Sequence, residues 1–268
     1  MRGERISRAD DPRIAAFRGV RDPELVRQRG QFVAEGRLVV RRAIEDGGFR
    51  VRAVLVNEAA LAQLGPVLAR VDADTAVYVC DTAVFVDLAG YNIHRGCLAL
   101  VDRPPARTID EVLAEANTIV VLERVANADN VGAVFRHAAA FGCGAVVLSP
   151  GCCDPFYRKA IRTSMGAVLR VPSAAAEPWP DALARIRAQG FTIAALTPRE
   201  PAVTLDAFAR ARPVRVALVA GAEGEGLGVE AEAIADARIR IPTSAAVDSL
   251  NVATAVAIAL YATRIPNP

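Results

Sequence analysis

The sequence predicts an α/β fold in two parts, and three observations support this. Short runs that are almost entirely apolar, such as TIVVLE (118–123) and GAVVLS (144–149), are typical of parallel strands buried on both faces. Stretches with apolar residues at helical spacing separate these runs. Between the two parts, the proline-containing segment DRPPART (102–108) interrupts the apolar pattern and is predicted to be a linker.

The first part, residues 1–104, is predicted to be a small α/β sandwich. Residues 1–20 are treated as an N-terminal extension. The remaining pattern alternates between the two kinds of element. Helices are expected at 31–47, 59–71 and 81–89, and strands at 52–57, 76–80 and 96–102.

The second part, residues 105–268, continues the alternation with longer units, which predicts a parallel sheet covered by helices on both faces. Strands are expected at 118–123, 144–149, 191–196, 214–221 and 238–242. Helices are expected at 129–142, 179–190, 228–236 and 249–264, and residues 160–172 are expected to pass from helix to strand.

Composition excludes several classes of protein. No apolar run approaches the roughly 20 residues that span a bilayer, and the start lacks the apolar centre of a secretory signal. We therefore expect a soluble cytoplasmic protein that binds no membrane. The net charge of +2 argues against a general nucleic-acid binder, although residues 1–52 hold 13 arginines against 8 acids. Such a segment is compatible with an RNA or DNA partner.

The five cysteines and two histidines do not form a metal-binding pattern. The cysteines are scattered, none belongs to a CxxC motif, and His94 and His137 lie far apart in the sequence. Zinc sites have closer ligand spacing. The sequence therefore predicts reduced thiols and no metal.

The stretch GAEGEGLG (221–228) has four glycines directly after an apolar strand, as a phosphate-binding loop would. It has neither the GxGxxG spacing of a dinucleotide-binding turn nor the lysine of a P-loop. Glu223 and Glu225 would repel a triphosphate. The remaining interpretations are a tight turn and a loop for a ligand other than a nucleotide phosphate, with Glu225 facing solvent.

Three stretches together carry a resemblance: NADNVGAVFR (127–136), LVAGAEGEGLG (218–228) and IPTSAAVDSLNVATA (241–255). In that order they resemble the three motifs of the SpoU, or TrmH-like, family of RNA ribose 2′-O-methyltransferases, which belongs to the SPOUT class. FVAEGRLVVRRAIEDG in the first part resembles an L30e-like substrate-recognition domain. The resemblance implies a deep trefoil knot in the second part, S-adenosyl-L-methionine (AdoMet) as cofactor and a homodimer.

The resemblance also assigns site residues. Those matching the catalytic motif positions are Asn130, Arg136, Glu223, Ser249 and Asn251. Those expected around AdoMet are Leu196, Thr197, Gly221, Gly226, Ile241 and Leu250. Asn130 is also expected to cap its helix, and Ser249 could be an ordinary helix cap. The glycine at 221 is expected to let the backbone approach a ligand.

Two interpretations of Arg136 stay open. It could activate the ribose 2′-hydroxyl, as the family resemblance implies, or it could hold a phosphate and stabilise the forming alkoxide. The chain also departs from the family pattern, with Asp129 inside the first motif, His137 after Arg136, and Ala253 in the third motif. These last two changes could alter how the pocket packs.

The expected activity is AdoMet-dependent methylation of a ribose 2′-hydroxyl in structured RNA. An L30e-like domain favours ribosomal RNA over tRNA. The alternatives are a tRNA methyltransferase and a catalytically silent RNA-binding protein of the same fold. A nicotinamide-dependent dehydrogenase is disfavoured because its fingerprint is missing. Arg158, Lys159 and Arg162 could contact RNA phosphate or form a solvated helix face.

Overall fold

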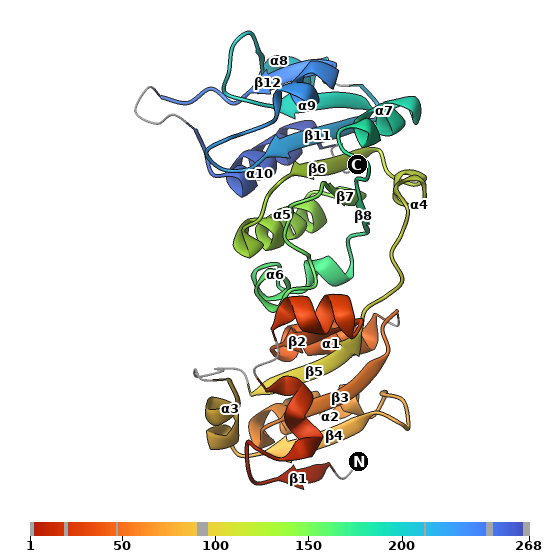
Figure 1. The fold of residues 1–268 in the computed structure, drawn as a ribbon, viewed down its shortest axis with the longest axis vertical. Helices are drawn as coiled ribbons and strands as arrows, with labels where there is room; N and C mark the ends of the chain where they lie inside the picture. Colours follow the sequence, from red (N-terminus) through yellow and green to blue (C-terminus); the bar gives the residue numbers. More distant parts are fainter. Residues whose placement is uncertain are drawn as a thin grey trace. The chain divides into compact units, whose positions relative to one another are not determined.

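Two compact units make up the chain in a computed structural model (Figure 1), which describes residues 3–18, 21–46, 48–89, 96–211, 213–244 and 249–264. The first unit comprises Met1–Pro105 with Pro155–Leu169, and the second comprises Ala106–Asp154 with Arg170–Pro268. The units differ from the predicted domains in one segment, because residues 155–169 belong with the first unit.

The first unit contains a mixed sheet. Among the described residues its strand order is β1-β4-β3-β5-β2, and β5 pairs antiparallel with both β2 and β3. The strands are β1 (Glu4–Ile6), β2 (Gln31–Glu35), β3 (Val51–Val56), β4 (Ala76–Cys80) and β5 (Cys97–Asp102). The α-helices are α1 (Arg37–Glu45), α2 (Glu58–Leu68), α3 (Thr82–Ala89) and α6 (Arg158–Thr163).

One sequence prediction for this unit is wrong in part. Residues 31–47 were expected to form one helix, but Gln31–Glu35 is the strand β2 and only Arg37–Glu45 is helical. Gly36 separates them, because its φ of 94° breaks the helical path. The N-terminal extension also joins the unit, since β1 pairs with β4 and the 3₁₀ helix Pro12–Phe17 buries Ile14 and Phe17.

The segment 155–169 packs on β2. The rings of Phe156 and Phe32 lie 5.0 Å apart. Arg158 Nε lies 3.4 Å from Asp22 Oδ1, and Arg162 Nη1 lies 3.8 Å from Glu35 Oε1. Both arginines therefore have acidic partners inside the first unit.

The second unit is built on a parallel sheet, as predicted. Its described strands run in the order β10-β12-β9-β11-β6-β7-β8, and every pairing among them is parallel. The strands are β6 (Thr118–Glu123), β7 (Ala145–Leu148), β8 (Ser173–Ala175), β9 (Thr192–Leu196), β10 (Val203–Thr204), β11 (Val216–Gly221) and β12 (Ala237–Arg240). The short strand β10 was not predicted.

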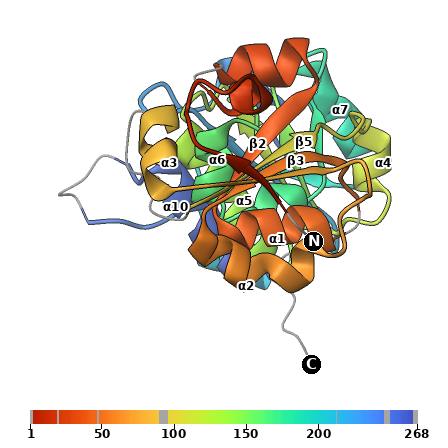
Figure 2. The same ribbon diagram turned by 90° about the horizontal axis from the view of Figure 1, so that it is seen from below.

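Helices cover both faces of this sheet. They are α4 (Ile109–Leu113), α5 (Ala128–Ala140), α7 (Asp181–Ala188), α8 (Leu205–Arg210), α9 (Val229–Ile234) and α10 (Val252–Thr263). Figures 1 and 2 both show α4 and α7 on one side, with α5 and α10 on the other. A core cluster joins α4, α7 and α9 to alternate residues of the central strands, such as Ile119, Val121 and Val219.

This topology places the carboxyl ends of four adjacent parallel strands at one edge. In the order β12-β9-β11-β6, these strands end at Arg240, Leu196, Gly221 and Glu123. Ligands of open α/β sheets bind at this edge. Two of the three sequence motifs therefore begin or end there, which makes this edge the place to look for a site.

The described residues contain no metal-binding cluster, no membrane-spanning helix and no disulfide. They contain no group of three or more His, Cys, Asp or Glu side chains that could hold a metal ion. None of their helices is both long enough and apolar enough to cross a bilayer. None of the five cysteines, all of which are described, forms a disulfide, and burial raises the pKa of the Cys80, Cys97 and Cys143 thiols to about 12, so these thiols stay protonated at neutral pH.

Candidate active site

A cavity of about 410 Å³ lies at the carboxyl edge of the second unit's sheet. Its walls come from the ends of β9, β11 and β12 and from the turn before α10. All six residues expected around a cofactor line it, namely Leu196, Thr197, Gly221, Gly226, Ile241 and Leu250. Glu223, Ser249 and Asn251 line it as well. The third motif also includes residues 245–248, which lie outside the described residues.

The loop of residues 221–228, called the cofactor loop here for its expected role, folds back on itself after β11. The Gly226 N–H donates to the Ala222 carbonyl over 2.9 Å, and Gly224 and Gly226 have φ of 84° and 71°. A Cβ on Gly221 would lie 2.2 Å from the Gly226 carbonyl carbon. The expected reason for glycine at 221 was therefore incomplete, because the loop's own backbone occupies the space that a side chain would need.

We expect Gly221→Ala to weaken AdoMet binding at least about 10-fold, because backbone atoms cannot yield to a methyl group at 2.2 Å. Gly224→Ala is the matched control: nothing lies within 4 Å of its Cβ position, so only the cost of its positive φ applies. Calorimetric titration of both variants measures the difference. Equal affinities would contradict this account of the loop.

Asn251 connects residues from all three motifs. Its Nδ2 donates to Asn130 Oδ1 over 3.0 Å and to Glu223 Oε1 over 2.6 Å. Its Oδ1 accepts from the N–H groups of Ala253 and Thr254, over 3.0 and 3.2 Å, and so caps α10. Both amide protons and the amide oxygen of Asn251 are thus used.

The helix cap expected at Asn130 is wrong, and the alternative that Ser249 is a cap is wrong as well. Asn127, not Asn130, caps α5, because its Oδ1 accepts from the Asp129 N–H over 2.9 Å. Asn130 lies in the first turn, is 7% exposed, and bonds to Asn251 instead. Ser249 precedes the true cap of α10 by two residues and is exposed at the cavity.

Arg136 lies on the exposed side of α5. At about 100° per residue, it is rotated roughly 120° around the helix from Asn130. Within the described part of the chain, no hydrogen bond or ion pair engages its guanidinium. A charged group in this position is available to an anion from outside the subunit.

Two of the departures from the family pattern, His137 and Ala253, contact each other. The His137 Nδ1 lies 3.1 Å from the Ala253 carbonyl oxygen, which can only accept, so the neutral ring carries its proton on Nδ1. Burial, with the Arg136 charge as a smaller contribution, lowers the pKa of His137 despite this bond. His137 follows Asn130 by two helical turns, so both hold the same face of α5 against the start of α10.

The lowered pKa of His137 predicts a pH dependence of stability. The unfolded chain, with a His pKa near 6.5, binds this proton more readily than the folded chain. The stabilisation that neutral His137 provides is therefore complete above about pH 6.5 and is lost as the pH drops through the pKa of the folded state. In His137→Asn, whose amide N–H can replace the Nδ1 donor, we expect a smaller loss between pH 7 and 5. Urea unfolding across this range measures it; identical pH profiles would contradict the assignment.

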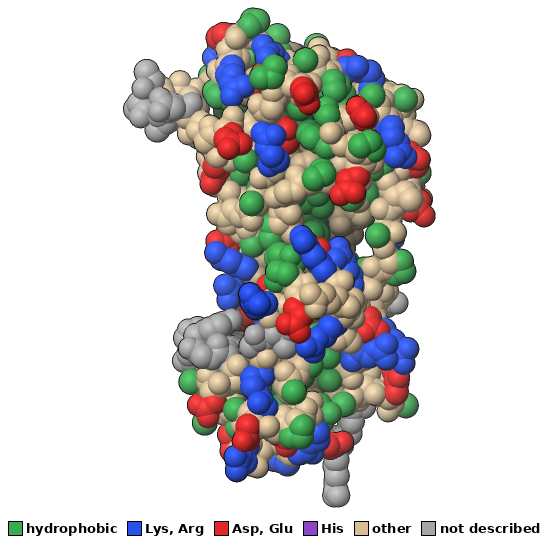
Figure 3. Space-filling view, in the orientation of Figure 1, with side chains coloured by type: hydrophobic (Ala, Val, Ile, Leu, Met, Phe, Trp, Pro, Cys, Tyr) green, Lys and Arg blue, Asp and Glu red, His purple; other side chains and the backbone are tan. Residues whose placement is uncertain are grey.

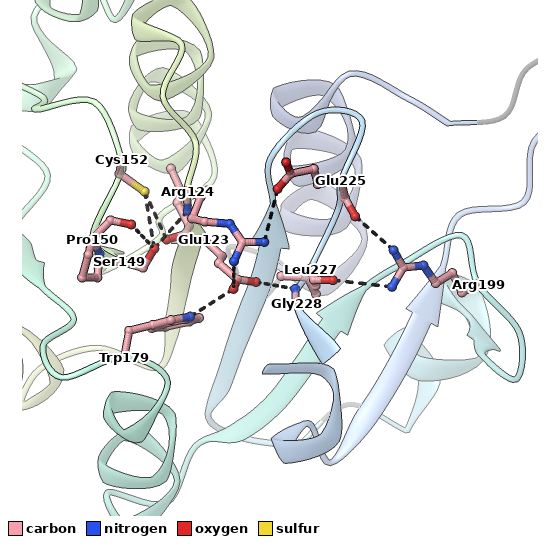
Figure 4. Close-up of polar contacts among 11 residues, drawn as sticks. Glu123, Arg124, Ser149, Pro150, Cys152, Trp179, Arg199, Glu225, Leu227 and Gly228 are labelled. Carbon is pink, nitrogen blue, oxygen red and sulfur yellow. Dashed lines mark hydrogen bonds and ion pairs between the residues drawn. The ribbon is translucent and has the colours of Figure 1, made fainter. Parts of the chain in front are cut away.

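The sequence did not reveal a second set of polar residues around the cofactor loop (Figure 4). Glu123 is buried at the end of β6 and accepts from the Gly228 N–H and the Trp179 indole. Arg124 Nη2 lies 3.6 Å from Glu225 Oε2, so Glu225 does not face solvent alone as expected. The only signal in the sequence was an acid closing the apolar strand TIVVLE.

Comparison with known proteins now identifies the family. The model of the SpoU rRNA Methylase family matches residues 117–261, just over half of the chain. An uncharacterized tRNA/rRNA methyltransferase of Mycobacterium tuberculosis, Rv0881, is 42% identical over 94% of this chain and 88% of its own length. The 23S rRNA (guanosine-2′-O-)-methyltransferase RlmB of Nitrosomonas europaea is 29% identical over 70% of this chain and 73% of its own.

Solved structures agree in fold. An AdoMet-bound rRNA methyltransferase from Sinorhizobium meliloti superimposes with a TM-score of 0.83 at 24% identity, covering 97% of both chains. An RNA 2′-O ribose methyltransferase superimposes with a TM-score of 0.81 at 29% identity, also covering 97% of both chains. With residues of three motifs bonded together beside one cavity, a family model matched over most of the second unit, and relatives aligned along nearly the whole chain, this protein belongs to the SpoU family of RNA methylases.

Proposed function

We propose that this protein transfers a methyl group from AdoMet to a ribose 2′-hydroxyl of structured RNA, with ribosomal RNA as the substrate. One observation carries the proposal. Asn130, Glu223 and Asn251, taken from three separate motifs, are joined by hydrogen bonds beside a cavity lined by the expected cofactor residues. Relatives named as 2′-O-methyltransferases of 23S rRNA, from N. europaea and Bacillus subtilis, support the choice of reaction and RNA.

The cavity suits AdoMet in size and chemistry. Its volume of about 410 Å³ lies within the roughly 300–1,000 Å³ of small-molecule sites. Leu196, Ile241 and Leu250 supply apolar walls, and the cofactor loop contains no lysine. AdoMet carries a sulfonium, so an acidic side chain such as Glu223 is compatible with it. The S. meliloti relative in fold, solved with AdoMet bound, supports this cofactor.

Some side chains would orient the ribose, and Arg136 would supply a positive charge. AdoMet supplies an electrophilic methyl group on a good leaving group, so the protein has to align the ribose oxygen and manage its proton. Glu223 and Asn251 hold one another at the cavity and orient the ribose side. Arg136 brings a cationic guanidinium with several N–H donors in a planar fork. It holds the adjoining phosphate, stabilises the forming alkoxide, or activates the hydroxyl.

The exposed apolar face of α10 is suited to pairing of two subunits. This helix is almost entirely apolar, yet Ile258 and Tyr261 are 37% and 56% exposed. An apolar face of this kind is typical of subunit contacts. We propose that two copies pair through it and that each active site draws residues from both. The proposal extends to a trefoil knot in the second unit, an L30e-like first unit, and a cytoplasmic location.

RNA recognition would depend on few of the basic residues in the first unit. Acidic partners engage several of its arginines: Arg5 with Glu58, Arg8 with Asp10, Arg13 with Asp11, Arg29 with Glu24, Arg50 with Asp74, and Arg52 with Asp102. Figure 3 shows blue basic side chains interleaved with red acidic ones. Arg21, Arg27 and Arg41 are exposed without such partners in the described residues. The excess of arginine is therefore a weaker argument for RNA than the motifs are.

Mapping of 2′-O-methyl nucleosides by mass spectrometry, in total RNA with and without the protein, tests activity and target together. The proposal expects one ribose methylation, in ribosomal RNA, to depend on the protein. A tRNA position would support the alternative substrate. Calorimetric titration that shows no AdoMet binding but clear NAD binding would overturn the proposal.

A further inference from the structure

Glu123 connects three elements beneath the cofactor loop. It ends β6, and its carboxylate is almost fully buried, with 2% of the side chain exposed. Oε2 accepts from the Gly228 N–H over 2.8 Å, and Oε1 accepts from Trp179 Nε1 over 3.1 Å. Arg124 Nη1 lies 3.2 Å from Oε1 and provides a counter-charge. A buried carboxylate with these donors is stable only as long as they remain in place.

The far end of the cofactor loop fits closely onto this carboxylate. A Cβ on Gly228 would lie 2.9 Å from Glu123 Oε1, so any larger residue there would force this buried carboxylate to shift. Gly228 also precedes α9, whose first turn starts at Val229. The bond from Glu123 to Gly228 therefore fixes the point where the cofactor loop becomes a helix.

Two arginines hold the middle of the loop from opposite sides (Figure 4). Arg124 reaches from buried Glu123 to Glu225, whose side chain is 78% exposed. Arg199 Nη2 donates to the Glu225 carbonyl over 3.0 Å, and its Nη1 lies 3.4 Å from buried Glu232. Both arginines are about half exposed, so water and salt weaken their contacts. The bond from the Gly228 N–H to buried Glu123 is less screened than either arginine contact.

We propose that Glu123 is the positioning residue of the cofactor loop and that Trp179, bonded to the same carboxylate, reports the state of that loop. The proposal rests on the proposed function in so far as the loop binds AdoMet. Glu123 itself faces the back of the loop and does not line the cavity. Its loss should therefore change cofactor affinity much more than the methyl-transfer step.

Glu123→Gln is the informative variant. The amide keeps one acceptor oxygen and has an NH₂ in place of the other. With the oxygen kept toward Trp179 and Arg124, the two donors at Oε1, the NH₂ faces the Gly228 N–H, and that bond is lost. We expect AdoMet to bind about 10- to 100-fold more weakly, the effect of losing one charged, buried hydrogen bond. The kcat at saturating AdoMet should stay within about 3-fold of the wild type, so the effect should appear in KM.

Hydrogen–deuterium exchange tests the same contact without cofactor. Peptides covering residues 221–228 should exchange faster in Glu123→Gln than in the wild type, because the Gly228 amide loses its buried acceptor. Trp179 is the only tryptophan, so its emission should change when AdoMet is added to the wild type, and this change should shrink in the variant. The control is Glu111→Gln, which alters a carboxylate that also accepts a backbone N–H, in α4, away from the loop.

Unchanged exchange and an AdoMet affinity within about 2-fold of the wild type would overturn the proposal. If Glu123→Gln does not fold, Gly228→Ala tests the contact from the loop side, and unchanged AdoMet affinity there would likewise overturn it. Wild-type protein that binds no AdoMet would refute the proposed function instead. The exchange comparison would still decide whether Glu123 positions the loop.

Discussion

Arg136→Ala should reduce methyl transfer by about 1,000-fold or more while leaving the fold intact. Removing one preorganised donor to the developing charge of a transition state typically lowers the rate about 10²- to 10³-fold. The alanine variant would also lose the bonds of the guanidinium to phosphate. The Arg136 side chain is exposed and has no hydrogen bond or ion pair in the described part of the chain. We therefore expect the melting temperature and the AdoMet affinity to stay unchanged.

Arg136→Lys separates the open roles. Lysine keeps the charge but cannot bond a phosphate in the two-pronged manner of arginine. If Arg136 holds phosphate, the lysine variant should bind RNA more weakly and keep its pH–rate profile. If it removes the proton, the rate should follow the deprotonation of the new amine, near pH 10, and rise with pH.

Arg210→Ala is the matched control, since Arg210 is an exposed arginine at the end of another helix of the same unit, α8. It should retain wild-type activity. Single-turnover assays with RNA and labelled AdoMet measure all three variants. An Arg136→Ala protein with more than about a tenth of the wild-type rate would refute a catalytic role.

The sequence predicted the parallel sheet well because a buried strand leaves a local signature. The cores of the runs at 118–123 and 214–221, IVVL (119–122) and VALVA (216–220), are apolar throughout, and each lies in a central strand. The prediction failed at 31–47, where apolar residues of a strand and a helix follow one another with only Gly36 between them. Periodicity averaged over the window could not separate two elements with different repeats.

The site was predictable only where a motif carried it. The motifs identified Asn130, Glu223 and Asn251 as candidates, and in the structure hydrogen bonds join the three side chains. Glu123 was missed because its partners, Trp179 and Gly228, lie 56 and 105 residues away. Contacts over such separations follow from the order of strands in the sheet, which local sequence patterns do not contain.

Asn251 allows its two tasks to be separated by substitution. Asn251→Ala removes both the cap of α10 and the link between Asn130 and Glu223. Loss of the cap should cost about 1 kcal/mol, which lowers the melting temperature by roughly 2–4 °C for a domain of this size. Methyl transfer should fall about 100-fold or more, because Glu223 loses the bond that orients it.

Asn251→Asp should keep the first task and lose the second. A carboxylate oxygen can still accept from the Ala253 and Thr254 N–H groups, and aspartate caps helices as well as asparagine does. The other oxygen, however, would face Asn130 Oδ1 and Glu223 Oε1 with no proton to donate. We expect a melting temperature close to that of the wild type, together with a loss of activity as large as in Asn251→Ala. Thermal unfolding and methyl-transfer assays on the same preparations test this. If Asn251→Asp kept full activity, the bonds to Asn130 and Glu223 would have no part in catalysis, and Asn251 would be a helix cap alone.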